Sequence, residues 1–169
     1  MQNLLLAAAA ATEAGAEVAP VIDVARRFAP GAHRQHLIAT IGSVPYVDDS
    51  KATNPHAALA AISSYDSVVL IAGGQSKGLD IASLARHPNV KALIAMGESA
   101  DLLCDAAPDI SHRVESMEAA VALAARLAEP GDVVLLSPGG ASWDMFDSYI
   151  HRGHVFAASV EAIAERSAS

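Results

Sequence analysis

The stretch S-V-V-L-I-A at residues 67–72, followed at once by G-G-Q-S-K-G at residues 73–78, determines the predicted fold class of this chain. After its first residue the run is apolar throughout, which is typical of a strand buried on both faces of a parallel sheet. The glycines that follow permit a tight loop. Similar strand-like runs stand at residues 90–96 and 132–136. The chain therefore repeats a unit in which a buried strand runs into a loop.

Helical segments lie between these strands. We expect helices at residues 81–86, 100–106 and 117–128, the last of them stopped by Pro130-Gly131, and a weak strand at residues 112–114. Strands that alternate with helices predict a Rossmann-like, doubly wound α/β domain with a mostly parallel sheet and helices on both faces. In such sheets ligands bind beyond the carboxyl ends of the strands. The loops at those ends are therefore the first place to look for a site.

The segment that precedes this alternation has a different character. Residues 2–14 and 20–28 predict two helices, so the α/β body is preceded by a short helical segment. Residues 37–41 and 46–47 are strand-like and are separated by the turn residues Gly42-Ser43. We therefore expect a β-hairpin at the entry to the main body.

Composition argues against several classes of protein. The chain has 169 residues, 52% of them apolar and 18% charged, which fits one compact globular domain. Its net charge of −8 and its scattered basic residues argue against nucleic-acid binding. The apolar run at residues 4–11 is too short for a membrane span and lacks the basic start of a signal peptide. The single cysteine, Cys104, fits a reducing compartment, so we expect a cytoplasmic protein without a membrane segment.

The loop D-D-S-K-A-T-N-P at residues 48–55 holds the densest group of polar side chains. Helix capping by Thr53 or Asn54, with proline in the first turn, explains part of it. Capping does not explain Asp49 or Lys51. A lysine beside the positive end of a helix is unfavourable unless an anion lies between them. We therefore expect an anionic ligand at this loop.

Two further loops follow predicted strands in the same way. Lys77 stands in the glycine loop, which is not a Walker A sequence. The stretch L-L-S-P-G-G-A-S-W-D-M-F at residues 135–146 contains Ser142 as a possible cap of a following helix, with Asp144 in its first turn. It does not match the G-x-S-x-G pattern of a serine hydrolase. Taken together, the three loops predict that two lysines and two hydroxyls hold a carboxylate or a phosphate.

The histidine pairs are weaker candidates. H-R-Q-H at residues 33–36 and H-R-G-H at residues 151–154 each lack a third ligand nearby, so hydrogen-bonded or surface histidines are the simpler interpretation. We therefore expect no metal site in this chain.

Several motifs in register resemble the C-terminal region of the Mur ligases. They are D-D-S-K-A-T-N-P at 48–55, L-I-A-G-G-x-x-K-G at 70–78, D-V-V-L-L-S-P-G-G-A-S-W-D-M-F at 132–146 and R-G-H-V-F at 152–156. The D-S-K-A-T-N version is similar to that of the members that add D-glutamate to UDP-N-acetylmuramoyl-L-alanine in peptidoglycan biosynthesis. The resemblance implies an ATP-dependent acid-amino-acid ligase, which activates a carboxylate as an acyl phosphate that the amine of D-glutamate attacks.

The resemblance also implies a division of the chain. Residues 1–30 are similar to the last helices of a central ATPase domain, and residues 31–169 to the C-terminal domain that brings in the amino acid. A hinge is expected near residues 29–32, where Pro30 and Gly31 stand. The chain carries no Walker A loop and none of the family's magnesium ligands. ATP and Mg are therefore implied as cofactors whose metal ligands lie in the missing domain, and this piece alone is not expected to turn over ATP.

The family's ATP contacts can be carried over onto matching positions. The resemblance implies that Asn3 touches the base, that Arg34 lies near the phosphates and that Asp49 lies at the ribose. His36 stands where an acidic residue is common in the family, so the detail around Arg34 is a departure from the pattern.

The substrate contacts are carried over in the same way. The resemblance implies that Lys51 and Thr53 act at the amino-acid and phosphate end of the site, as catalytic residues, and that Lys77 and Ser142 hold the carboxylates of D-glutamate. The complete set implied to bind substrate is Lys51, Thr53, Lys77, Ser142, Trp143 and Tyr149.

Two other interpretations stay open at this point. A free-standing nucleotide or amino-acid binding module could use the same fold without chemistry, because fold alone does not decide function. A different Mur-type ligase, such as a polyglutamate synthase or a partner of a lipid-linked amidotransferase, would usually carry another sequence in place of D-S-K-A-T-N.

Overall fold

The computed structural model describes residues 2–28 and 31–167, without the side chains of Gln2, Asn3 and Ser167. The chain divides into two compact units, Met1–Gly31 and Ala32–Ser169. The predicted contact of Asn3 with the ATP base lies outside the described residues, as do residues 29–30 of the predicted hinge.

The first unit is a pair of helices, α1 (Gln2–Glu13) and α2 (Val18–Arg27). Gly15 follows α1 with a φ of 94°, a conformation in which glycine ends helices readily. The helix α2 begins two residues before the predicted start, and Pro20 is tolerated in its first turn because N–H groups there have no partner within the helix. The predicted helical segment is thus confirmed.

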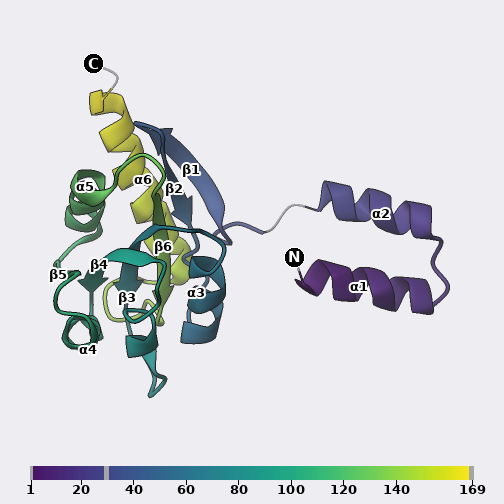
Figure 1. Ribbon diagram of the computed structural model, residues 1–169, viewed down its shortest axis with the longest axis horizontal. Helices are drawn as coiled ribbons and strands as arrows, with labels where there is room; N and C mark the ends of the chain where they lie inside the picture. Colours follow the sequence, from purple (N-terminus) through teal and green to yellow (C-terminus); the bar gives the residue numbers. More distant parts are fainter. Residues whose placement is uncertain (1, 29–30, 168–169) are drawn as a thin grey trace. The chain divides into compact units, whose positions relative to one another are not determined.

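The second unit is built on a six-stranded sheet in the order β1-β2-β6-β3-β4-β5 (Figure 1). Its strands are β1 (His36–Ile41), β2 (Val44–Asp48), β3 (Val68–Gly73), β4 (Val90–Met96), β5 (Ser111–Arg113) and β6 (Val133–Gly139). The strands β1 and β2 form an antiparallel hairpin with a register shift between Leu37 and Ala39, and the other pairings are parallel. The predictions of an entry hairpin and of a mostly parallel sheet are both confirmed.

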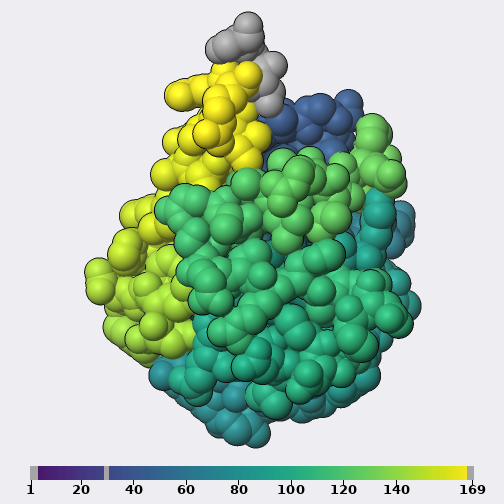
Figure 2. Space-filling view, turned by 90° about the vertical axis from the view of Figure 1, so that its left-hand side faces the viewer, coloured from purple at the N-terminus to yellow at the C-terminus, as the bar shows by residue number. Residues whose placement is uncertain are grey.

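Helices cover both faces of this sheet. They are α3 (Pro55–Ile62), α4 (Ala100–Ala106), α5 (Met117–Leu127) and α6 (Tyr149–Ser167), together with the short 3₁₀ helix η1 (Ile81–Ser83). One core holds residues of α3, η1 and α4, and the other holds residues of α5 and α6. Along β3, Leu70 faces the first core and its neighbours Val69 and Ile71 face the second. Figure 2 shows the side where α4, β5 and α5 lie in shades of green, with α6 in yellow beside them.

Two local predictions were wrong. The helix expected at residues 81–86 is a single 3₁₀ turn, Ile81–Ser83, and Pro88 follows too soon for a longer helix. No helix begins at Ser142. Its carbonyl accepts the N–H groups of Met145 and Phe146 at 3.2 and 2.8 Å, which closes one turn that does not continue, and α6 begins only at Tyr149.

Candidate functional site

The first loop of the site joins β2 to α3. Asn54 is the N-cap of α3, and its side-chain oxygen accepts the N–H of Ala57 at 2.9 Å. Pro55 occupies the first turn, as expected from its fixed φ. Capping therefore uses Asn54 and leaves the exposed hydroxyl of Thr53 available to a ligand.

A cavity of about 200 Å³ lies where the loops after β2, β3 and β6 meet. These three strands are neighbours in the sheet, so their carboxyl ends face one crevice. The residues that line the cavity are Thr53, Lys77, Ala141, Ser142, Trp143 and Tyr149. The structure thus brings together residues from each of the three loops singled out in the sequence.

Lys51 lies beside this cavity rather than in its wall. Its Nζ is 5.2 Å from the centre of the Tyr149 ring, which itself lines the cavity. A cation over an aromatic face is held by the ring quadrupole. Lys51 and Lys77 are therefore associated with one crevice, although they come from different loops.

The loops that carry Lys77 and Ser142 touch each other through their backbones. Gln75 and Ala141 form an isolated bridge in which each N–H donates to the other's carbonyl at 2.9 Å. A Cβ at Gly140 would lie 2.7 Å from the carbonyl oxygen of Gly73, so this approach requires glycine. Lys77 itself has a φ of 52°, which is uncommon for a residue with a side chain.

Asp49 is buried next to the hairpin rather than displayed to solvent. Its Oδ1 accepts the N–H of Gln35 at 3.2 Å and its Oδ2 accepts the hydroxyl of Ser137 at 2.8 Å. Burial raises the pKa of Asp49 to about 6, although these hydrogen bonds and the nearby charge of Arg34 act in the opposite direction. Arg34, by contrast, is exposed. Arg34 and Asp49, two of the three predicted ATP contacts, thus lie near each other, one exposed and the other buried.

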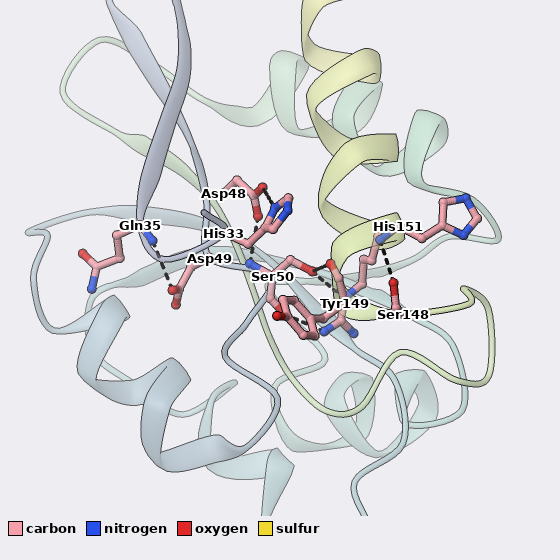
Figure 3. Close-up of polar contacts among 9 residues, drawn as sticks. His33, Gln35, Asp48, Asp49, Ser50, Ser148, Tyr149 and His151 are labelled. Atoms are coloured by element: carbon pink, nitrogen blue, oxygen red, sulfur yellow. Dashed lines mark hydrogen bonds and ion pairs between the residues drawn. The ribbon is translucent and has the colours of Figure 1, made fainter. Parts of the chain in front are cut away.

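His33 is a hydrogen-bonded histidine, as the sequence predicts, but its partner Asp48 was not identified from the sequence. This ring is buried, and its Nδ1 lies 2.6 Å from Oδ2 of Asp48 (Figure 3). The ring also packs edge-on against Tyr149 and His154. Among the described residues, no group of three or more histidine, cysteine, aspartate or glutamate side chains is placed to hold a metal ion.

Arg152 is a second residue that the sequence did not single out. It is only 2% exposed, and it donates to the hydroxyl and carbonyl of Ser50 at 3.0 and 2.8 Å and to the carbonyl of Gly140 at 3.1 Å. The hydroxyl of Ser50 in turn donates to the carbonyl of Tyr149 at 2.7 Å (Figure 3). Burial lowers the pKa of Arg152 to about 10, so the group remains charged at neutral pH. The buried side chain of Arg152 therefore joins the first loop, through Ser50, to the third loop, through Gly140.

The sequence does contain a signal for this arrangement in the R-G of residues 152–153. A Cβ at Gly153 would collide with Nδ1 of His33 and would lie 2.8 Å from Oδ2 of Asp48. A glycine inside a helix normally costs about 1 kcal/mol relative to alanine, so its presence indicates a close neighbour. The helix α6 thus carries both Arg152, which joins the loops, and Gly153, whose missing side chain leaves room for the ring of His33.

No helix within residues 2–28 and 31–167 is both long and apolar enough to cross a membrane.

The family model described as "Mur ligase, glutamate ligase domain" matches residues 33–140. The UDP-N-acetylmuramoylalanine--D-glutamate ligase of Pelotomaculum thermopropionicum is 45% identical over 163 residues, which cover 92% of this chain and 36% of the relative. The enzyme of the same name from Thermobifida fusca is 45% identical over an alignment of 174 positions that covers 96% of this chain and 37% of the relative. The chain thus spans about a third of the length of these curated relatives.

Solved structures with similar folds are more distant in sequence. MurF from Acinetobacter baumannii has a TM-score of 0.68 at 17% identity, and the match covers 95% of this chain and 37% of that one. The UDP-N-acetylmuramate-alanine ligase MurC from Thermotoga maritima has a TM-score of 0.66 at 15% identity, with the same coverage. These neighbours support the fold, which is the mostly parallel α/β arrangement predicted from the sequence.

Proposed function

This chain belongs to the Mur ligase family through its glutamate ligase domain, and we propose that it is the D-glutamate-binding part of an ATP-dependent ligase that joins D-glutamate to UDP-N-acetylmuramoyl-L-alanine in peptidoglycan biosynthesis. The proposal is supported above all by the cavity lined by Thr53, Lys77 and Ser142, because these residues come from three separate loops. A cytoplasmic location is part of the same proposal, since the substrate is nucleotide-linked and the reaction uses ATP.

The cavity suits a small dicarboxylic amino acid. Its volume of about 200 Å³ is below the range of roughly 300 to 1,000 Å³ that is common for drug-sized ligands. The ammonium group of Lys77 and the hydroxyl of Ser142 can each bind a carboxylate oxygen through a charge-assisted hydrogen bond. Trp143 and Tyr149 supply apolar surface for the methylene groups of glutamate. The proposed ligand thus matches the walls in charge and in shape.

The reacting end of the site is assigned to Lys51 and Thr53. ATP supplies the phosphoryl group that activates the substrate carboxylate, and negative charge accumulates on the phosphoryl oxygens during transfer. The ammonium group of Lys51 stabilises that charge, and the hydroxyl of Thr53 donates a hydrogen bond to it. Both side chains start from the loop before α3, whose backbone is held by hydrogen bonds from the N–H of Lys51 to the carbonyl of His33 at 3.1 Å and from the N–H of Thr53 to the carbonyl of Lys51 at 2.9 Å.

The ATP contacts are assigned to the hairpin side of the same crevice. The exposed guanidinium group of Arg34 suits phosphate oxygens, which it can bind in a bidentate manner. The carboxylate of Asp49 has one partner on each oxygen and retains lone pairs for a ribose hydroxyl. We assign the Mg ligands to parts of the ligase that lie outside this chain.

The proposed division of labour follows the two units. We assign residues 1–30 to the end of a central ATPase domain and residues 31–169 to the amino-acid-binding domain. The exposed apolar side chains of α1 and α2, such as Leu5 and Val24, support the first assignment because they need a partner surface. On this proposal the chain alone does not turn over ATP.

A chimera tests the proposed function directly. This chain replaces the matching region of the Thermobifida fusca relative, and phosphate release is measured as a function of D-glutamate concentration. We expect turnover that requires ATP, UDP-N-acetylmuramoyl-L-alanine and D-glutamate. Lys77→Ala and Ser142→Ala should each raise the KM for D-glutamate by about tenfold, with a smaller change in the KM for ATP.

Arg126→Ala on the exposed side of α5 is the control for loss of a basic side chain. A chimera that turns over normally with Lys77→Ala and keeps the original KM for D-glutamate would refute the assigned site. A chimera without turnover, together with tight binding of D-glutamate or a nucleotide by the 169-residue chain in calorimetry, would favour a free-standing binding module instead.

A further inference from the structure

We propose that Ser99 and Asp144 are positioning residues, which hold the loops of Lys77 and Ser142 at the spacing that D-glutamate requires. This inference rests on the proposed function for its substrate. Neither residue lines the cavity, so each acts through the residues that do. Both converge on a short loop after β4, residues 97–99, to which no ligand contact has been assigned.

Ser99 fixes the loop that carries Lys77. Its side chain is almost completely buried, and its hydroxyl donates to the carbonyl of Gly74 at 2.6 Å. The N–H of Gly74 donates in turn to the carbonyl of Met96 at 3.2 Å. Gly74, at the start of the lysine loop, is thus held through both its N–H and its carbonyl, by the last residue of β4 and by the loop that follows it. A glycine with a φ of 99° would otherwise be free to take other conformations.

Asp144 fixes the loop that carries Ser142. Its Oδ2 accepts the N–H of Glu98 at 2.8 Å, although the two residues are 46 positions apart. The carboxylate lies directly over Gly97, where a Cβ would collide with it. Asp144 also stands on the single turn that the carbonyl of Ser142 closes. The position of Ser142 and Trp143 therefore depends on this contact.

A closed ring of hydrogen bonds results. The Gln75 and Ala141 bridge joins the lysine loop to the serine loop, Asp144 joins the serine loop to residues 97–99, and Ser99 joins residues 97–99 to the lysine loop. The side chain of Gln75 adds a contact of 3.1 Å to Glu98. A ring restricts the separation of Lys77 and Ser142 in a way that a single bridge cannot. Displacement of a binding group by about 1 Å can reduce activity by large factors, so this restriction matters for substrate affinity.

The test uses the chimera described above with Asp144→Ala, Asp144→Asn and Ser99→Ala. We expect Asp144→Ala to raise the KM for D-glutamate by roughly tenfold and to leave the KM for ATP within about twofold. Asp144→Asn keeps an acceptor oxygen for the N–H of Glu98, so it should restore a KM close to the original value. Ser99→Ala removes one hydrogen bond and should raise the same KM by a smaller factor.

Asp147→Ala is the matched control, because Asp147 lies in the same loop, carries the same charge and is 95% exposed in its side chain. It should leave the KM for D-glutamate unchanged. If Asp144→Ala and Ser99→Ala both leave that KM unchanged in an active chimera, the positioning role is wrong. The same conclusion follows if Asp144→Asn raises the KM for D-glutamate as much as Asp144→Ala does. The negative charge of Asp144, rather than its hydrogen bond to Glu98, would then account for the effect on KM.

A second measurement separates this inference from the proposed function. Amide hydrogen exchange of Gln75 and Ala141 is measured by NMR in the 169-residue chain and its variants. We expect faster exchange in Asp144→Ala than in Asp147→Ala, because loss of the ring loosens the bridge. A chimera without D-glutamate-dependent turnover would refute the proposed function. Unchanged exchange in Asp144→Ala would refute the ring itself.

Discussion

The two units of this chain use similar apolar side chains with opposite results. In the second unit Leu135 and Phe156 are completely buried between the sheet and its helices. In the first unit Leu5 is 66% exposed, and none of its described side chains is buried. Apolar composition therefore does not by itself produce a core. A twisted sheet presents two faces that helices can cover, whereas a pair of helices can bury only the strip along which they touch.

The two units also differ in how many buried polar groups hold their loops in place. The proposed site residues with described side chains lie in the second unit, where the buried side chains of Arg152 and His33 hold Ser50 and Asp48 in and beside the first loop. The first unit offers no comparable support within residues 4–28. Comparable substitutions in the two units should therefore have unequal effects, and four pairs of substitutions test this.

The largest difference is expected for loss of a leucine side chain. Leu135→Ala leaves a cavity inside the sheet and should lower the free energy of unfolding by about 3 to 5 kcal/mol. Leu5→Ala changes an exposed position and should stay within about 0.5 kcal/mol. Urea unfolding followed by circular dichroism measures both. Equal losses in the two variants would show that the first unit has a core of its own.

The next effect concerns pH and Asp49. Burial raises the pKa of Asp49 to about 6, above the value of roughly 3.9 expected in the unfolded chain. The folded state therefore binds more protons between these values, and the contribution of this group to stability falls as pH rises from about 4 to 6. Relative to the native chain, Asp49→Asn should gain about 2 to 3 kcal/mol between pH 4 and pH 7.

Unfolding free energies at several pH values measure this difference. Glu13→Gln in the exposed helix α1 shows what the loss of a solvated carboxylate does under the same conditions. A difference between Asp49→Asn and the native chain that stays flat with pH would contradict the raised pKa.

A smaller effect is expected where glycine is replaced by alanine. Gly153→Ala adds a methyl group beside His33 and Asp48 and should lower the free energy of unfolding by about 1 to 3 kcal/mol, although alanine is the better helix former. Gly31→Ala meets nothing within 4 Å and should be neutral or slightly stabilising. Thermal unfolding by calorimetry compares the two. A more stable Gly153→Ala variant would mean that His33 does not need this space.

The smallest effect is expected at the helix N-termini. Asn54→Ala removes the hydrogen bond to the N–H of Ala57 and should cost about 1 kcal/mol. Glu17→Ala stands at the corresponding position of α2, where the side chain makes no capping hydrogen bond, and should change little. Chemical unfolding detects the first change and sets a limit on the second. If Glu17→Ala lowered the free energy of unfolding as much as Asn54→Ala does, the side chain of Glu17 would contribute as much to its helix N-terminus as the Asn54 cap does.

The periodic parts of the chain could be predicted from sequence. The strand Val90–Met96 and the helix Ala100–Ala106 have the predicted bounds, because their apolar patterns and glycine stops are local signals. Pairing of β1 with β2 follows from the turn residues between them. The convergence of Thr53, Lys77 and Ser142 on one cavity follows from the rule for parallel sheets. The chemical roles of these residues remain predictions.

The parts that could not be predicted depend on distant contacts. Arg152 reads as a surface residue of a helix, yet its partner Ser50 is 102 positions away. Asp144 was expected in a first helical turn, whereas its carboxylate binds the N–H of Glu98. The buried carboxylate of Asp49 accepts the hydroxyl of Ser137, which stands in β6, 88 positions away. Local patterns contain no information about such partners, because they arise only when the sheet is assembled.

The two edges of the sheet have a consequence for behaviour at high concentration. A strand edge with free N–H and C=O groups can template pairing with a second chain and start aggregation. Here β1 carries an irregularity between Leu37 and Ala39, and β5 is only three residues long and ends in the exposed His112 and Arg113. Neither edge offers a long, flat run of unpaired groups. The folded sheet is therefore protected against amyloid-like stacking.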